Sequence, residues 1–196
     1  MFLYPPRPEK AVIPGHLPMF EGMGFTAEYK KNGTCTEIEN SAGLTSWTRH
    51  KEPHKSWNIN TFPAQELLLE IENSIFVGEL LHSKGVGVTN TLYLFDLLKY
   101  RGKLLIGISL QARRDILHSL WPIKKLHYSH YEIHSNLWIA RSYDSKFSEI
   151  FDGITKVEDE GIVLKDPKAL LLPCFKEGTN AGWQVKCRKP TKNYSF

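Results

Sequence analysis

The sequence has few cysteines, no long apolar run and only a small excess of charge. Its three cysteines form no CxxC pair, so they indicate neither a disulfide framework nor a zinc site. No stretch approaches the ~18 apolar residues of a membrane span, and the proline-rich N-terminus lacks the apolar core of a signal peptide. We therefore expect a soluble protein of a reducing compartment, placed in the cytoplasm, with no membrane partner.

The charge balance permits a polyanionic partner without requiring one. The formal net charge is +4, from 25 Lys and Arg against 21 Asp and Glu. No acid follows Glu177, so the C-terminal tail 189–196 is basic and suits a phosphate-rich partner, although a solvated, frayed terminus is the alternative. With 196 residues, 41% of them hydrophobic, the chain can bury a full core as one domain spanning residues 1–196, expected to be a monomer.

Local patterns predict an α+β fold. Prolines in residues 1–18 indicate an extended arm. Asn32-Gly33 is a hairpin-turn signal between predicted strands at 25–29 and 35–38. Further strands are predicted at 44–49, 75–81, 91–97, 137–141, 160–165 and 182–188. Helices are predicted at 64–73, 109–120 (with Ser109 as its N-cap) and 145–156. Strands and helices do not alternate regularly and the turns are tight, which favours antiparallel pairing.

Lys30 is the candidate nucleophile. The predicted strand and turn place it where its amine can project into a cleft, and there it could attack the α-phosphate of a nucleotide. A free lysine is mostly protonated at neutral pH, so it needs burial or nearby cations to expose its amine. The nearby positive charge could come from Lys31, Arg49, Lys165 and Lys186. The alternative is a solvated lysine beside a turn.

Two acids lie inside apolar runs. Glu79 and Asp96 would each be costly to bury alone, so each should pair with a cation, metal or hydroxyl. Phe95 could stack on a purine, although in isolation the pair Phe95-Asp96 favours core packing for Phe95.

The last two predicted strands carry further charges. Alternation puts Gly161, Val163 and Lys165 on the face opposite Glu160, so a cleft shared by Glu160 and Lys165 is not forced. Lys186 and Arg188 share one face and could bracket a polyphosphate. A solvated face of a terminal strand is the alternative for this pair.

In chain order, these segments resemble the nucleotidyltransferase domain of ATP-dependent polynucleotide ligases, relatives of the mRNA capping enzymes. The matching segments are KKNG at 30–33, WTR at 47–49, VGEL at 77–80, LFDLL at 94–98, EGIVLK at 160–165 and WQVKCR at 183–188. The resemblance implies an ATP-grasp-like domain with two packed, mainly antiparallel sheets and flanking helices. It implies catalysis by Lys30 through a lysyl-AMP intermediate, with ATP and Mg²⁺ (or Mn²⁺) as cofactors.

The resemblance also assigns roles to the remaining residues. Glu28 and Phe95 would bind adenine, Glu79 and Glu160 the ribose and metal, and Arg49, Lys165, Lys186 and Arg188 the phosphates. The implied substrate is a nicked duplex with a 5′-phosphate and a 3′-hydroxyl. DNA is favoured because Lys165 ends its segment as in DNA ligases. Such ligases carry a following OB domain. The residues after Arg188 are too few for that barrel, so we expect no OB domain within these residues. Either the chain is one part of a larger protein, or it is a small ligase that works without that domain, and a separate OB-type or clamp partner is one option.

Three positions depart from the family pattern. Asn32 stands where DNA ligases have aspartate, Val77 replaces another aspartate, and Arg188 replaces a lysine. Asn32-Gly33 resembles some RNA ligases more closely. An RNA ligase, or a non-catalytic module that binds nucleic-acid ends, therefore stays open as an alternative.

Overall fold

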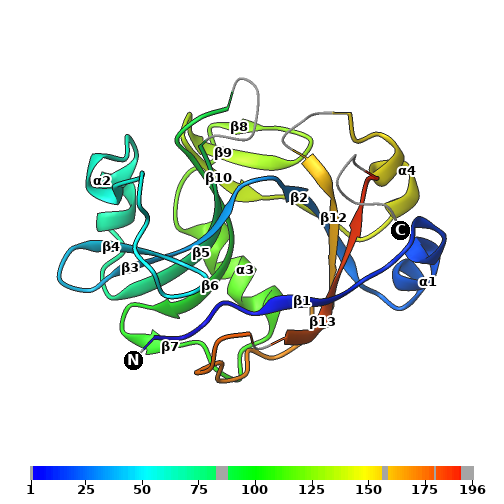
Figure 1. Cartoon of the computed structure of the whole chain (residues 1–196), viewed down its shortest axis with the longest axis horizontal. Helices are drawn as coiled ribbons and strands as arrows, with labels where there is room; N and C mark the ends of the chain where they lie inside the picture. The colour runs from blue at the N-terminus through cyan, green and yellow to red at the C-terminus, as the bar shows by residue number, and fades with distance from the viewer. Residues whose placement is uncertain (1, 83–87, 156–158, 179, 191–196) are drawn as a thin grey trace.

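The computed structural model of the chain describes residues 2–82, 88–155, 159–178 and 180–190. Two β-sheets lie on either side of helix α3 (Leu110–Ser119), as Figure 1 shows. This arrangement confirms the predicted α+β fold. Among the described residues, no helix is long and apolar enough to cross a membrane.

The small sheet has the strand order β1-β13-β12-β2-β11. Its neighbours pair antiparallel except β1 with β13. Its strands are β1 (Arg7–Ala11), β2 (Thr26–Lys31), β11 (Ser142–Tyr143), β12 (Asp159–Lys165) and β13 (Asn180–Arg188). The first and last described strands of the chain therefore lie side by side.

The large sheet has the order β4-β3-β5-β6-β10-β9-β8, with β7 paired to β6. Its pairs are antiparallel except β6 with β10. Its strands are β3 (Thr34–Asn40), β4 (Leu44–Thr48), β5 (Ser74–Leu81), β6 (Thr91–Tyr100), β7 (Lys103–Leu104), β8 (Lys125–Leu126), β9 (His130–His134) and β10 (Leu137–Ala140).

Short helices cover the outer side of each sheet. Helices α1 (Leu17–Gly22) and α4 (Phe147–Asp152) lie beside the small sheet, and α2 (Gln65–Leu69) lies beside the large sheet (Figure 1). Two 3-10 turns, η1 (Pro14–His16) and η2 (Ile59–Thr61), complete the described elements. Ser109 caps α3 as predicted, because its hydroxyl accepts a hydrogen bond from the Ala112 N–H at 3.3 Å.

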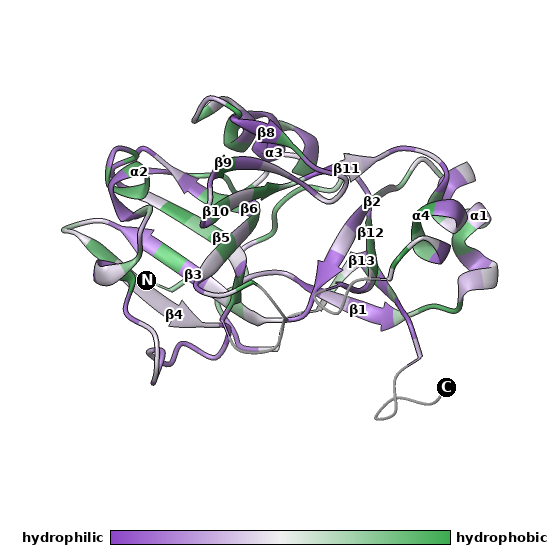
Figure 2. Cartoon of the chain, turned by 90° about the horizontal axis from the view of Figure 1, so that it is seen from above, coloured by the Kyte–Doolittle hydropathy of each residue, from purple (hydrophilic) through white to green (hydrophobic). Residues whose placement is uncertain are grey.

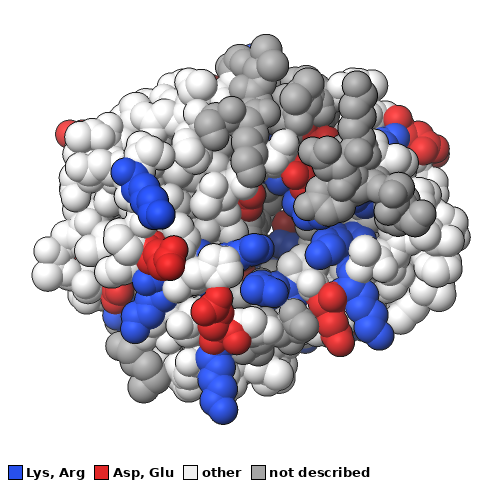
Figure 3. Space-filling view, viewed as in Figure 1, with Lys and Arg blue, Asp and Glu red and all other residues white. Residues whose placement is uncertain are grey.

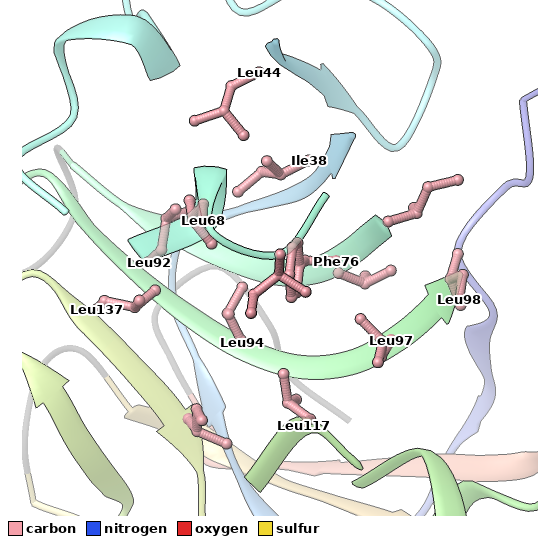
Figure 4. Close-up of a cluster of buried hydrophobic side chains, with 14 of the residues drawn as sticks. Ile38, Leu44, Leu68, Phe76, Leu92, Leu94, Leu97, Leu98, Leu117 and Leu137 are labelled. Atoms are coloured by element: carbon pink, nitrogen blue, oxygen red, sulfur yellow. The ribbon is translucent and has the colours of Figure 1, made fainter. Parts of the chain in front are cut away.

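Each sheet has its own hydrophobic core. The larger cluster packs β3, β5, β6 and β10 against α2 and α3 around Phe76 and Leu94 (Figure 4). The smaller cluster packs α1 and α4 against β2, β12 and β13 around Phe147 and Ile162. In Figure 2, hydrophobic segments run along β5 and β10, while α1 and α4 carry both polar and apolar residues. Burial of separate cores leaves the two inner faces free to carry polar groups.

Several sequence predictions need correction. Asn32-Gly33 does not close a hairpin, because β2 belongs to the small sheet and β3 to the large one. The chain instead passes from one sheet to the other at these two residues. The helices predicted at 64–73 and 145–156 are shorter, as α2 and α4. The arm at 1–18 contains strand β1, turn η1 and the start of α1.

Candidate active site

Lys30 and Lys31 point to opposite faces of β2. Lys31 Nζ lies 2.6 Å from Asp159 Oδ1 and 3.1 Å from Ser129 Oγ, with its side chain 1% exposed. Lys30 contacts Glu160 and is 18% exposed. Since consecutive residues of a strand alternate in direction, Lys30 lies beside Glu160, while Lys31 is enclosed by Asp159, Ser129 and the ring of Tyr93.

A β-bulge places Glu160 beside Lys30. The register between β12 and β2 shifts between Asp159 and Gly161, so strict alternation, which the sequence analysis assumed, fails here. Gly161 has φ +148°, and a Cβ at this position would lie 2.0 Å from the Cys187 carbonyl oxygen. Glycine is therefore required here. Glu160 Oε2 also lies 3.6 Å from Arg188 Nε.

Glu79 of β5 approaches the same point from the large sheet. The Gly33 N–H donates to Glu79 Oε1 at 3.0 Å, so the crossing between the sheets is tied to this carboxylate. Burial raises the pKa of Glu79 to about 7, while the charge of Lys30 and the Gly33 N–H act to lower it. The negative charge of Glu160 also raises this pKa. The two predicted metal carboxylates are thus close enough to interact beside Lys30.

A second group of residues lies further along the cleft. Lys165 Nζ is 2.5 Å from Glu28 Oε2, and both side chains are almost fully buried. The same Nζ lies 4.7 Å from the centre of the Phe95 ring, on β6 of the large sheet. The predicted adenine-binding residues Glu28 and Phe95 therefore meet across the two sheets through Lys165.

Cations gather at the end nearer Lys30. Burial lowers the pKa of Lys186, and the positive charges of Arg188, Lys30, Arg7 and Arg49 lower it further. Figure 3 shows Lys and Arg side chains around a central depression of the surface. Such a cluster is electrostatically costly without an anion, so it fits a polyphosphate.

Sequence reasoning missed two cations. Arg7 lies on β1, whose parallel pairing with β13 brings it into the field of Lys186. Arg114 of α3 donates from Nη1 to Thr26 Oγ1 at 3.0 Å and lies 3.6 Å from Glu28 Oε1. Adjacent arginines inside an amphipathic helix could have indicated a buried charge partner for Arg114. No local signal indicated Arg7.

Asp96 pairs with helix α3. Arg113 of α3 donates to both of its carboxylate oxygens, from Nε at 2.8 Å and from Nη2 at 2.9 Å. Both side chains are buried. The expected pairing of this acid is confirmed, and its cation fixes α3 against β6.

Two other features lie apart from this cleft. His127, His130 and Glu132 converge at the β8–β9 turn, but the two imidazole rings are stacked at 15°, with centroids 4.4 Å apart. Ring nitrogens bind metals in the ring plane, so two stacked rings cannot share one ion in this arrangement. A groove of about 740 Å³ lies between β4 and residues 53–61, and none of the predicted site residues lines it.

The chemistry of the cleft fits ATP. Glu28 Oε1 is buried and accepts no hydrogen bond from any described residue, so it offers an acceptor to a ligand donor such as the adenine amine. Glu79 and Glu160 offer hard oxygen ligands beside Lys30, which suits Mg²⁺ held jointly by one or two carboxylates and substrate phosphates.

Comparisons with known proteins agree with this geometry. No family model matches the sequence, and no curated protein matches it. Among solved structures, a mycobacterial DNA ligase D complexed with ATP has a TM-score of 0.69 at 19% identity, over 95% of this chain and 60% of that chain. A Lig E DNA ligase has a TM-score of 0.62 at 14% identity, over 96% and 70%. The chain has the fold of a ligase adenylation domain.

This ligase fold is shared with RNA ligases. An archaeal ATP-dependent RNA ligase has a TM-score of 0.56 at 18% identity, over 93% of this chain and 47% of that chain. The chain thus spans about 60% of the ligase D structure and less than half of the RNA ligase.

Proposed function

We propose that the chain is an ATP-dependent DNA ligase that seals 5′-phosphate/3′-hydroxyl nicks through a lysyl-AMP intermediate. The observation that carries this proposal is that two adjacent lysines have different surroundings. Lys31 is locked into a buried ion pair, and Lys30 faces carboxylates and cations in the cleft.

In the first step, Lys30 Nζ attacks the α-phosphorus of ATP. A phosphorus–nitrogen bond forms, the bond to the bridging oxygen breaks, and pyrophosphate leaves. The ammonium must first lose a proton, and Glu160, which contacts the amine, is the nearest described acceptor. The Glu160 contact also holds Nζ in place for in-line attack.

The cations of the cleft act on the triphosphate. Lys186, Arg188 and Arg49 supply positive charge where negative charge leaves with pyrophosphate, and partial burial strengthens their effect. Mg²⁺ held by Glu79 and Glu160 would neutralise the triphosphate as well. Glu28 and Phe95 orient the base at the other end of the cleft.

In the remaining steps, AMP passes from Lys30 to the 5′-phosphate of a nick, and the 3′-hydroxyl then displaces AMP to join the strand. Duplex binding would depend on phosphate contacts from Lys and Arg around the cleft (Figure 3). We therefore expect nick binding to weaken steeply as salt increases.

The test is covalent labelling with α-labelled ATP and Mg²⁺, followed by denaturing electrophoresis. The wild-type chain should retain label, and Lys30→Ala and Lys30→Arg should retain none. Lys31→Met is the neighbouring control, and it should still take label if circular dichroism shows that it is folded. Loss of label in folded Lys31→Met, with label kept in Lys30→Ala, would show that the nucleophile is Lys31 and not Lys30.

The second candidate is an RNA ligase, favoured by Asn32 and by the archaeal RNA ligase of similar fold. Sealing rates on DNA–DNA, RNA–DNA and RNA–RNA nicks separate the two. Much faster sealing of RNA ends would overturn the DNA assignment. A wild-type chain that binds nicks but takes no label would instead be a non-catalytic end-binding module.

A further inference from the structure

Arg114 reaches the base end of the cleft from the opposite side to Lys165. It lies on α3, which packs against β6, yet its guanidinium contacts two residues of β2 in the other sheet. Nη1 donates to Thr26 Oγ1 at 3.0 Å, and Nε lies 3.6 Å from Glu28 Oε1, with 3% of the side chain exposed. Arg114 is thus a fixed connection between the sheets.

Glu28 is held by two cations but keeps one oxygen available. Lys165 occupies Oε2 at 2.5 Å, while Arg114 lies beyond hydrogen-bond distance of Oε1. An ionised carboxylate can only accept hydrogen bonds. Since Oε1 has no donor among the described residues, it can accept a hydrogen bond from a bound ligand.

The position of Phe95 indicates which part of a ligand meets Oε1. A base stacked on Phe95 would place its edge beside the Glu28–Lys165 pair, because Lys165 Nζ lies 4.7 Å from the ring centre. Adenine carries an amine donor at its 6-position, whereas guanine carries an acceptor oxygen there. An ionised carboxylate fixed at this edge pairs with the first and repels the second.

We propose that Arg114 is a positioning residue that fixes Glu28 for adenine, and so makes the site select ATP over GTP. This proposal rests on the proposed function, because it requires a nucleotide in this cleft. Arg114 restricts the carboxylate by its charge and by its bond to Thr26, leaving Oε1 directed at the base. Without Arg114, Glu28 can rotate towards Lys165 alone, and the penalty against guanine falls.

The experiment compares dissociation constants of ATP and GTP by competition binding, together with KM and kcat for lysine labelling. In Arg114→Met we expect the dissociation constant of ATP to rise about tenfold and the preference for ATP over GTP to fall at least about fivefold. The effect on labelling should appear in KM for ATP more than in kcat. Arg114→Lys should recover part of the preference, because it keeps the charge but not the two-pronged geometry.

Arg113→Lys is the matched control. It changes the adjacent arginine of the same helix, which donates to Asp96 instead of lying beside Glu28. We expect it to lower the melting temperature and to leave the ratio of the ATP and GTP dissociation constants unchanged. Glu28→Gln should abolish the preference, and the double variant Arg114→Met with Glu28→Gln should add little to it.

If the ratio of the GTP and ATP dissociation constants in folded Arg114→Met stays within twofold of the wild-type ratio, the proposal is overturned. If Arg114→Met does not fold, an unchanged ratio of these dissociation constants in Arg114→Lys overturns it. A fall in kcat with unchanged KM would also overturn it, because that places Arg114 in the chemical step. A wild-type chain that binds neither nucleotide, or takes no label, would contradict the proposed function instead.

Discussion

Lys31 and Asp159 form a buried ion pair directly behind Lys30 and Glu160. The two pairs use consecutive residues of the same two strands, and they lie on opposite faces of the small sheet. Tyr128 also donates to Asp159 Oδ2 at 2.9 Å, and Ser129 accepts from Lys31. This hydrogen-bonded pair lies at the bulge that carries Glu160 and holds it in place.

Removing one member of this pair should be more harmful than removing both. Asp159→Asn leaves Lys31 as a buried charge with no acid, which costs about 3–5 kcal/mol. Lys31→Met combined with Asp159→Leu removes both charges and should cost less than Asp159→Asn alone. Urea unfolding of Lys31→Met, of Asp159→Leu and of the double variant that combines them measures the coupling. Additive free-energy changes would show that the pair does not act as a unit.

Gly161→Ala should destroy the bulge. The new Cβ would clash with the Cys187 carbonyl at 2.0 Å in a backbone region that favours glycine. We expect a loss of about 3 kcal/mol or more in unfolding free energy, together with slower labelling of Lys30. Gly182→Ala on the neighbouring strand is the control, because its Cβ would meet only the end of the Glu9 side chain, at 2.9 Å. Equal losses in the two variants would refute the assigned role of Gly161.

Glu37 should make stability depend on pH. Its side chain is buried on β3, neither oxygen accepts a hydrogen bond from a described residue, and burial with nearby Glu39 raises its pKa to about 8. A raised pKa means that its stabilising effect is complete below about pH 4 and is lost as the pH rises towards 8. This pKa shift lets the unfolding free energy change by at most about 5 kcal/mol between these pH values.

The measurement is the unfolding free energy at pH 5, 6, 7 and 8. The wild-type chain should lose stability over this range relative to Glu37→Gln, whose amide does not titrate. Glu39→Gln is the companion variant, since it removes the nearby charge and should shift the wild-type transition to lower pH. Parallel curves for wild type and Glu37→Gln would rule out Glu37 as the titrating group.

Phe95→Ala should weaken nucleotide binding without changing base preference. Stacking on an aromatic ring contributes about 1–3 kcal/mol and is available to every base. We therefore expect the dissociation constants of ATP and GTP to rise by the same factor, between about 5-fold and 150-fold. Phe95→Tyr should stay near wild type. A change confined to ATP would mean that Phe95 itself reads the base, in contrast to Arg114.

The sequence predicted the elements more reliably than their partners. Apolar patterns located β5, β6 and α3, because short-range periodicity determines which residues face a core. Asn32-Gly33 was read as a hairpin because a tight turn has the same local signature whether the strands pair or part. Arg7 and Lys186 are far apart in sequence, and no local pattern reports that their strands pair.

The positions of site residues were predictable where a charged residue interrupts an apolar segment of the sequence. The fold brings Glu79, which stands inside an apolar run, and Lys186 and Arg188 of the last strand near Lys30, and their roles stay predictions. The orientation of Glu160 was not predictable, because period-two alternation takes no account of a bulge. Arg114 was overlooked because its partners Thr26 and Glu28 lie far away along the chain.

The crossing at Asn32-Gly33 joins the strand that carries the nucleophile to the large sheet. These two residues begin two positions after Lys30, and the chain crosses between the sheets again from β10 to β11. A base held between Glu28 and Phe95 would contact both sheets, because Glu28 lies on β2 and Phe95 on β6. We therefore expect base recognition at one end of the cleft to affect the position of Lys30 at the other.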